Sequence, residues 1–191
     1  MSYASSTQQL KSLRAQIGEI RKQMRGIQAA IEPQPVNDYV FQTTAGPRAL
    51  SSYFGDKPDL IVIHNMGRSC PYCTMWADGY NGVYDHLANR AAFLVTSPDA
   101  PEVQREFAVS RGWRFPMASH AGSTFAADMG YRSEKGGWMP GISVFRRRDG
   151  GLVRVSDAEL GPYDDFSPVW HLFDLMPEGA GSWSPRFKYA V

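Results

Sequence analysis

A short apolar stretch that leads into a pair of cysteines constrains this chain more than any other feature of its sequence. Residues 60–64 read LIVIH, are bounded by a proline and a glycine, and are typical of a buried strand. Cys70 and Cys73, the only cysteines of the sequence, follow with Pro71 between them. Because proline is favoured in the first turn of a helix, this segment predicts a strand, a C-x-x-C motif and a helix in that order.

This arrangement gives the two thiols different chemistry. Partial positive charge at the amino end of a helix stabilises a thiolate, so we expect a lowered pKa for Cys70. At the exposed mouth of the helix, Cys70 should also be the faster thiol to alkylate. Cys73 lies one turn further in and can close a disulfide with Cys70. The motif therefore predicts a reversible pair in which Cys70 attacks an external disulfide or peroxide and Cys73 resolves the intermediate.

Two other roles for the cysteines stay open. A zinc site needs about four ligands, so histidines would have to complete it, and the candidates are His64, His86, His120 and His171. His86 follows Cys73 as in a zinc finger, but positions 90–92 hold no second histidine. We therefore expect neither a metal nor a cofactor, while a pair of buried or idle thiols remains the plain alternative.

The composition limits the location and the partners. A length of 191 residues with 43% hydrophobic and 20% charged residues is typical of one folded domain, with room for an extra arm. A net charge of +1 creates no field that would attract nucleic acid or anionic lipid. No apolar run approaches the roughly 18–20 residues of a membrane span. The amino-terminal segment lacks a secretory signal, although its composition would also suit a transit peptide, and we expect a cytoplasmic protein.

The strongest periodicity is an apolar stripe near the amino terminus. Its members recur at intervals of three and four from Leu10 to Ile31 and predict a helix of about six turns that ends before Pro33. Such a stripe either docks on its own domain or pairs with a second chain. The excess of basic residues weakens a parallel self-pair. We divide the chain into an arm, 1–35, and a main domain, 36–191, and predict a homodimer in which the arm crosses to the other subunit.

Strands and helices alternate through the middle of the chain. We expect a Gly-Pro turn at 46–47, strands at 60–64 and 91–97, helices at 71–90 and 100–112, a hairpin at 141–155, and a last helix near 166–175. This order describes an α/β fold in which a mixed sheet is flanked by helices.

Several segments resemble a known group of proteins. CPYC, LIVIH and MPGISVF resemble the thioredoxin superfamily, and CPYC is similar to the active-site motif of glutaredoxins. Over nearly the whole chain, segments such as CPYCTMWADGYNG and RGWRFPMASHAGSTFAADMG are similar to a bacterial thioredoxin-like family of unknown function, DUF899. The resemblance implies a thioredoxin-like fold with a peroxiredoxin-like insertion at 98–138. It implies a fold and not an activity.

The thioredoxin resemblance also implies residues that contact the substrate. Pro140 stands before a predicted strand, where thioredoxin-type folds place a cis-proline against the disulfide, although it could simply begin an edge strand. Met139 would then offer backbone groups to an extended substrate, while its side chain only packs. Pro71 and Tyr72, inside the motif, would contact the substrate as well.

Other residues near the motif have more than one expected role. His64 stands where thioredoxins have a buried acid, so it either accepts the proton of Cys73 or is satisfied within the strand layer. Trp76 and Tyr80 are expected to bury against the sheet. Asp78 is expected to be solvated or to cap a helix.

The resemblance and the motif together predict a thiol–disulfide oxidoreductase that uses Cys70 and Cys73. A thiol peroxidase is the alternative, but Gly67 and Gly141 stand where peroxiredoxins have a threonine and an arginine. An alternative of another class is a thioredoxin fold that only binds a partner or a metal. The expected substrate is a protein or small-molecule disulfide or a peroxide, with an electron donor that the sequence does not identify.

Overall fold

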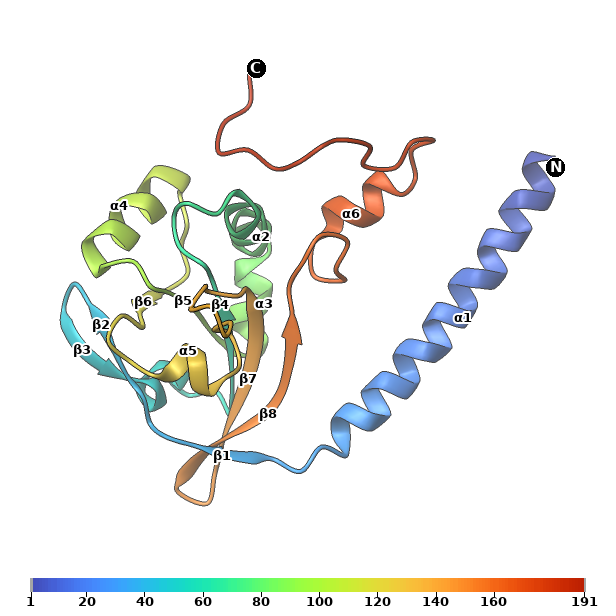
Figure 1. The fold of residues 1–191 in the computed structure, drawn as a ribbon. Helices are drawn as coiled ribbons and strands as arrows, with labels where there is room; N and C mark the ends of the chain where they lie inside the picture. Colours follow the sequence, from blue (N-terminus) through green and yellow to red (C-terminus); the bar gives the residue numbers. More distant parts are fainter. Residues whose placement is uncertain (1, 191) are drawn as a thin grey trace. The chain divides into compact units, whose positions relative to one another are not determined.

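The computed structural model describes residues 2–190, which form two units, one ending at Pro33 and one beginning at Gln34. The first unit contains α1 (Tyr3–Ala29), labelled in Figure 1. Ser2 caps its amino end, because the hydroxyl accepts the N–H of Ser5 at 3.2 Å. The helix begins ahead of the apolar stripe and ends just before its last member, and no side chain described in it is buried.

The second unit is built on a mixed sheet. Between residues 34 and 190 the sheet has eight strands in the order β1-β8-β7-β4-β5-β6-β2-β3. The strands are β1 (Gln34–Val36), β2 (Val40–Thr43), β3 (Gly46–Ala49), β4 (Asp59–His64), β5 (Ala92–Ser97), β6 (Met117–Ser119), β7 (Gly141–Arg148) and β8 (Gly151–Glu159). β4 runs parallel to β5 and antiparallel to β7, and β5 runs parallel to β6. The carboxyl ends of β4, β5 and β6 therefore lie at one edge.

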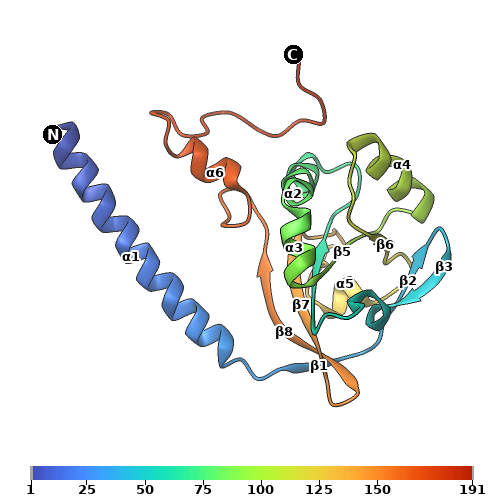
Figure 2. The same ribbon diagram turned by 180° about the vertical axis from the view of Figure 1, so that it is seen from behind.

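The helices of this unit are short. They are α2 (Pro71–Gly82), α3 (Tyr84–Arg90), α4 (Pro101–Arg111), α5 (Phe125–Asp128) and α6 (Pro168–Phe173), with a 3-10 helix, η1 (Leu50–Phe54). The single helix predicted at 71–90 is in fact two helices, α2 and α3 (Figure 2). The backbone leaves helical geometry at Val83, with φ −114° and ψ 14°. Val83 directly follows Gly82, which is a poor helix former.

Some of the other elements predicted from the sequence are confirmed, and others are not. The helix at 100–112 is confirmed and ends at Gly112, whose left-handed φ of 67° suits glycine. The hairpin is confirmed as β7 and β8, which turn at Asp149 and Gly150. The turn expected at 46–47 lies earlier, between the end of β2 and Gly46. β6 and α5 were not predicted, because each is too short to show a period.

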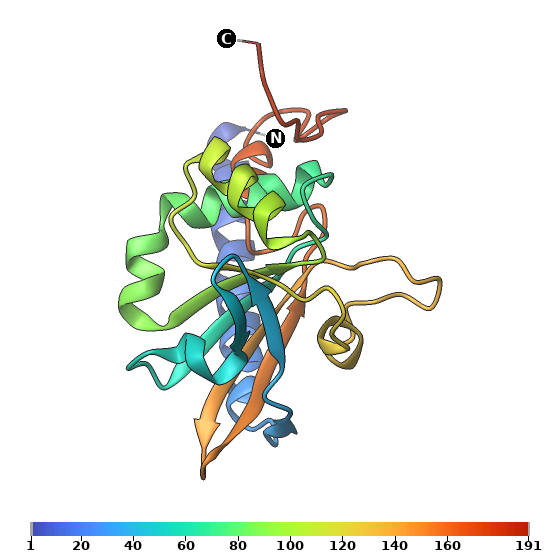
Figure 3. The same cartoon turned by 90° about the vertical axis from the view of Figure 1, so that its left-hand side faces the viewer.

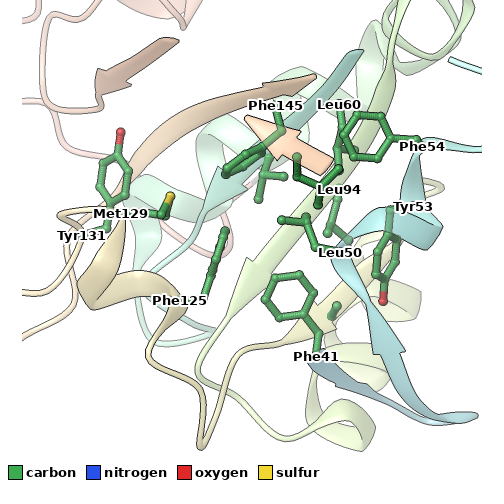
Figure 4. Packing of buried hydrophobic residues seen from close by; sticks show 13 residues of the cluster. Phe41, Leu50, Tyr53, Phe54, Leu60, Leu94, Phe125, Met129, Tyr131 and Phe145 are labelled. Atoms are coloured by element: carbon green, nitrogen blue, oxygen red, sulfur yellow. The ribbon is translucent and has the colours of Figure 1, made fainter. Parts of the chain in front are cut away.

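Each side of the sheet carries its own hydrophobic core. Side chains alternate along β4, so Leu60 and Val62 pack on one side and Ile61 and Ile63 on the other. The first side carries the Phe125 core, in which rings from α5 and β2 pack against β7 (Figure 4). The opposite side carries the Cys73 core, which includes both cysteines. Figure 3 shows α5 and α3 on opposite sides of the strands.

No helix among the described residues has the length and the apolar character that crossing a bilayer requires.

Candidate active site

Cys70 forms the amino-terminal cap of α2. Its backbone is extended, and its Sγ accepts the N–H of Cys73 at 3.0 Å, as the side-chain oxygen of a serine or aspartate does at other helix starts. Its carbonyl oxygen accepts both the N–H of Thr74 at 3.1 Å and the Thr74 hydroxyl at 3.0 Å. Pro71 follows as the first residue of the helix. The sulfur of Cys70 is therefore fixed where the helix offers backbone donors to an anion.

The two thiols have opposite shifts in pKa. Hydrogen bonding from the Cys73 thiol, helped by the backbone N–H groups of Cys73 and Tyr72, lowers the pKa of Cys70 to about 7 against the opposing effect of burial. The hydrogen bond to Cys70, together with burial, raises the pKa of Cys73 far above its ordinary value. Near neutral pH about half of the Cys70 sulfur is therefore a thiolate, whereas Cys73 stays a protonated thiol.

Both cysteines are buried. Cys70 is 8% exposed and Cys73 is 2% exposed, so Cys70 is the more accessible of the two, but it does not lie at an open mouth. The Sγ of Cys73 also accepts the N–H of Met66 at 3.4 Å. Neither cysteine is in a disulfide. Cys70 therefore offers more surface to a reagent than Cys73 does.

Aromatic side chains from the end of the chain pack against the motif. The ring of Tyr72 lies 6.2 Å from Trp76 and 6.3 Å from Trp170 of α6, measured between ring centroids. Trp170 in turn contacts Tyr163 and Trp183. Sequence reasoning did not single out Tyr163, Trp170 and Trp183, because their spacing has no regular period. Tyr72, expected to contact substrate, is partly covered by Trp170.

His64 lies on the opposite side of the sheet from the cysteines. Ile63 belongs to the Cys73 core, and the next side chain along the strand points the other way. The His64 ring stacks on Tyr131 at 4.0 Å and on Phe125 at 5.1 Å, and its Nε2 lies 2.9 Å from Ser143 Oγ. Burial lowers its pKa well below the ordinary value. The suggestion that His64 accepts the proton of Cys73 is therefore wrong, because the sheet separates the two side chains.

A second buried histidine lies near His64. His120 follows the end of β6, and its ring meets Trp138 edge-on at 4.8 Å. Burial lowers the pKa of His120. The positive charge of a protonated His120 would in turn disfavour protonation of His64. Within residues 2–190, the Nδ1 atoms of both histidines have no hydrogen-bond partner. The two imidazoles are therefore held neutral beside each other on the side without cysteines.

The segment before β7 does not form the expected substrate cradle. No peptide bond in the described chain is cis, so the prediction of a cis bond at Pro140 is wrong. The N–H of Met139 donates to the carbonyl of Tyr131 at 3.0 Å, and the carbonyl of Pro140 accepts the N–H of Leu160 at 3.2 Å. These groups are engaged within the domain because residues 131–139 fold back as a hairpin. Met139 and Pro140 therefore do not offer these two groups to an extended substrate.

The structure explains why Gly67 and Gly141 stand where the resemblance to peroxiredoxins led us to expect a threonine and an arginine. Gly67 has a left-handed φ of +104°, and a Cβ there would lie 3.0 Å from the carboxylate of Asp99. A Cβ at Gly141 would lie 1.8 Å from the ring of Tyr131. The local backbone therefore excludes a threonine at the first position, and the Tyr131 ring excludes an arginine at the second.

Polar residues later in α2 anchor the helix. Asp78 accepts hydrogen bonds from Trp113 Nε1 at 2.8 Å and from the guanidinium of Arg111. Asn81 accepts the N–H of Arg114 at 2.9 Å. Asp78 is therefore a structural anchor and not a capping residue, while its side chain stays 37% exposed. Trp76 is buried, and Tyr80 packs edge-on against Phe93 of the sheet, as predicted.

No group of three or more His, Cys, Asp or Glu side chains in the described part of the chain is placed to hold a metal ion.

Comparisons with known proteins give the family and the fold. Residues 7–189 match the model of a family described as a bacterial protein of unknown function, DUF899. No curated protein matches the sequence. Among solved structures, peroxidoxin BcpB from Mycobacterium tuberculosis is 26% identical with a TM-score of 0.55, covering 66% of this chain and 84% of that chain.

Two further structures have the same fold at lower identity. A PrxQ mutant from Xylella fastidiosa is 14% identical with a TM-score of 0.57, covering 66% of this chain and 84% of that chain. Reduced Prx3 from Vibrio vulnificus, in complex with hydrogen peroxide, is 15% identical with a TM-score of 0.54, covering 70% and 90%. The predicted thioredoxin-like fold of the peroxiredoxin type is confirmed.

Proposed function

Because the chain belongs to the DUF899 family, whose name specifies no activity, we propose its function from the site itself. The protein is a thiol–disulfide oxidoreductase in which Cys70 is the nucleophile and Cys73 is the resolving thiol. The observation that carries this proposal is the Sγ of Cys70, which accepts the Cys73 N–H at 3.0 Å at the start of α2. A pKa of about 7 for Cys70 makes about half of its sulfur a thiolate at neutral pH.

The proposed cycle uses the difference between the two thiols. The Cys70 thiolate attacks one sulfur of an external disulfide, forms a mixed disulfide and releases the other sulfur as a thiolate. Cys73 then gives its proton to solvent and attacks Cys70, which closes the Cys70–Cys73 disulfide and releases the second substrate sulfur. The substrate gains two electrons and the protein loses them. A cytoplasmic thiol pool would reduce the pair again.

A second candidate is reduction of a small hydroperoxide, and one specific observation favours it. Cys70 is only 8% exposed, so a small molecule reaches it more easily than a protein disulfide does. The similar Prx3 structure is described as a complex with hydrogen peroxide. In this reaction Cys70 takes the distal oxygen and becomes a sulfenic acid, with the alcohol or water as leaving group. Cys73 then attacks Cys70, forms the disulfide and releases water.

Single-turnover oxidation of the reduced full-length protein tests both candidates. We expect oxidised glutathione or hydrogen peroxide to remove two thiols per chain and to give an intramolecular disulfide. The Cys73→Ser variant should stop at a glutathione adduct or a sulfenic acid on Cys70, identified by mass spectrometry. The faster oxidant separates the two candidates. If Cys70→Ser reacted as fast as the native chain, or if neither oxidant removed thiols, the proposal would fail.

A further inference from the structure

Helix α1 exposes a continuous apolar stripe. The exposed fractions of its members range from 48% at Ile17 to 71% at Ile27, with Leu10 at 50%. The stripe within the helix consists of Leu10, Leu13, Ile17, Ile20, Met24 and Ile27. Exposed apolar surface of this extent marks an interaction site in a folded protein. Packing of such a stripe also supplies most of the stability of a long helix in water.

The stripe has the register of a coiled coil. Its spacing alternates strictly between three and four residues, which places Leu10, Ile17 and Met24 at heptad position a and Leu13, Ile20 and Ile27 at position d. A helix that docks on a globular domain usually has a wider stripe that includes position e or g. Both of these positions are polar here: Arg14, Arg21 and Gln28 at e, and Gln9, Gln16 and Gln23 at g.

The residues at e and g distinguish the two possible orientations of a pair. In a parallel pair, each g residue faces the next e residue of the partner helix, so Gln9 faces Arg14 and Gln16 faces Arg21. A glutamine carbonyl accepts a hydrogen bond from a guanidinium. In an antiparallel pair, e faces e, so Arg14 of one helix would face Arg21 of the other, and like charges repel.

The remaining basic residues do not oppose a parallel pair. Lys11 and Arg25 fall at position b and Lys22 at position f, which point away from the seam. Total charge had suggested that a parallel pair is disfavoured, but the heptad register separates these charges from the interface. We propose that α1 pairs with α1 of a second copy of this chain as a parallel coiled coil.

Disulfide trapping tests the orientation in the full-length protein. The native cysteines are first replaced through Cys70→Ser and Cys73→Ser, and Leu13→Cys or Met24→Cys is then added. A disulfide needs the two Cα atoms within about 7 Å. In a parallel pair each variant links to itself on oxidation, whereas in an antiparallel pair only a mixture of the two variants links. We expect self-linking by each variant, and linking in the mixture alone would overturn the proposal.

Light scattering over a range of concentrations tests the pairing itself. We expect the native chain to have the mass of a dimer and the Ile17→Lys/Ile20→Lys variant to have the mass of a monomer, because two charges would be buried in the seam. The matched control is Ser12→Lys/Ala15→Lys, which adds the same charge at the outward positions c and f and should remain a dimer. A monomeric or trimeric native chain, or a dimeric Ile17→Lys/Ile20→Lys variant, would contradict the proposal.

Discussion

The two sides of the sheet differ most where β4 ends. Ile63 faces the two thiols, while His64, the next residue, faces Phe125 and Tyr131. On the thiol side, Cys70 is surrounded by donors that stabilise an anion. On the other side, two buried imidazoles have Nδ1 atoms without a partner among residues 2–190, and burial keeps them neutral. Residues adjacent in sequence thus belong to separate environments, one that stabilises a charged group and one that keeps its ionisable groups neutral.

The largest expected effect tests whether the sheet separates these environments chemically. Cys70→Ser should slow the single-turnover oxidation by at least about 10³-fold, because a hydroxyl at this pH is a far weaker nucleophile. His64→Phe should leave the rate unchanged within a factor of about two, because the imidazole lies across the sheet. Stopped-flow thiol oxidation measures both. A large loss of rate in His64→Phe would show that the imidazole affects the thiol reaction. It would contradict the separation of the two sides of the sheet.

The next effect concerns the two thiols themselves. Iodoacetamide should label Cys70 faster than Cys73 at all pH values near neutral, with a midpoint at the Cys70 pKa of about 7. Cys73 should react slowly, because its pKa is raised and its side chain is buried. Peptide mass spectrometry of the native chain after partial labelling at each pH gives the rate of each thiol while the hydrogen bond between them is intact. Faster labelling of Cys73 would reverse the assignment of nucleophile and resolving thiol.

Added volume at Gly141, on the histidine side of the sheet, should lower the stability of the fold. Gly141→Ala places a Cβ 1.8 Å from the Tyr131 ring, which stacks on His64. We expect a loss of at least about 3 kcal/mol in the free energy of unfolding, measured in urea.

The matched control for this loss lies on the thiol side. Gly79→Ala in α2 meets no atom within 4 Å and should leave the stability equal or raise it by up to about 1 kcal/mol. Equal losses in the two variants would show that the Tyr131 contact is not the cause.

The smallest effect is a dependence of stability on pH. The pKa of His64 and of His120 is lowered in the folded state, so below about pH 6.5 the unfolded chain binds more protons than the folded one. The free energy of unfolding should then fall by up to about 1.4 kcal/mol per pH unit for each histidine as the pH decreases. His64→Phe should reduce this slope. An unchanged slope in His64→Phe would refute the assignment.

Local patterns in the sequence predicted the elements whose structure depends on neighbouring residues in the chain. The strand at 60–64, the helix start at Pro71 and the turn at Asp149 each follow from residues within a few positions. The failures depend on contacts from elsewhere in the chain. His64 could be matched to the cysteines by its position in the sequence, but the alternation of side chains along β4 turns it away. The peptide bond before Pro140 is trans, and Pro140 follows directly on the hairpin at 131–139. No local pattern in the sequence predicts that hairpin.

Contacts from distant segments also explain the other misses. From the sequence alone, Asp78 is expected to be an acid on the surface of a helix. Its role depends on Arg111, at the end of α4, and on Trp113, which follows that helix. Trp170 reaches Tyr72 only because α6 packs near the motif. The candidate thiols themselves were predictable, since the cap geometry at Cys70 requires only the motif and the helix that follows it.

The pairing of β1 with β8 has a consequence for how the chain folds. Gln34 pairs with Arg154, so the sheet joins residues from near the two ends of the chain. Contacts of such long sequence separation form slowly, whereas a helix forms within about a microsecond. During synthesis, α1 leaves the ribosome long before the residues that complete the sheet. If α1 pairs as proposed, two nascent chains on one messenger join through their arms first, and assembly precedes the folding of the domain that carries the thiols.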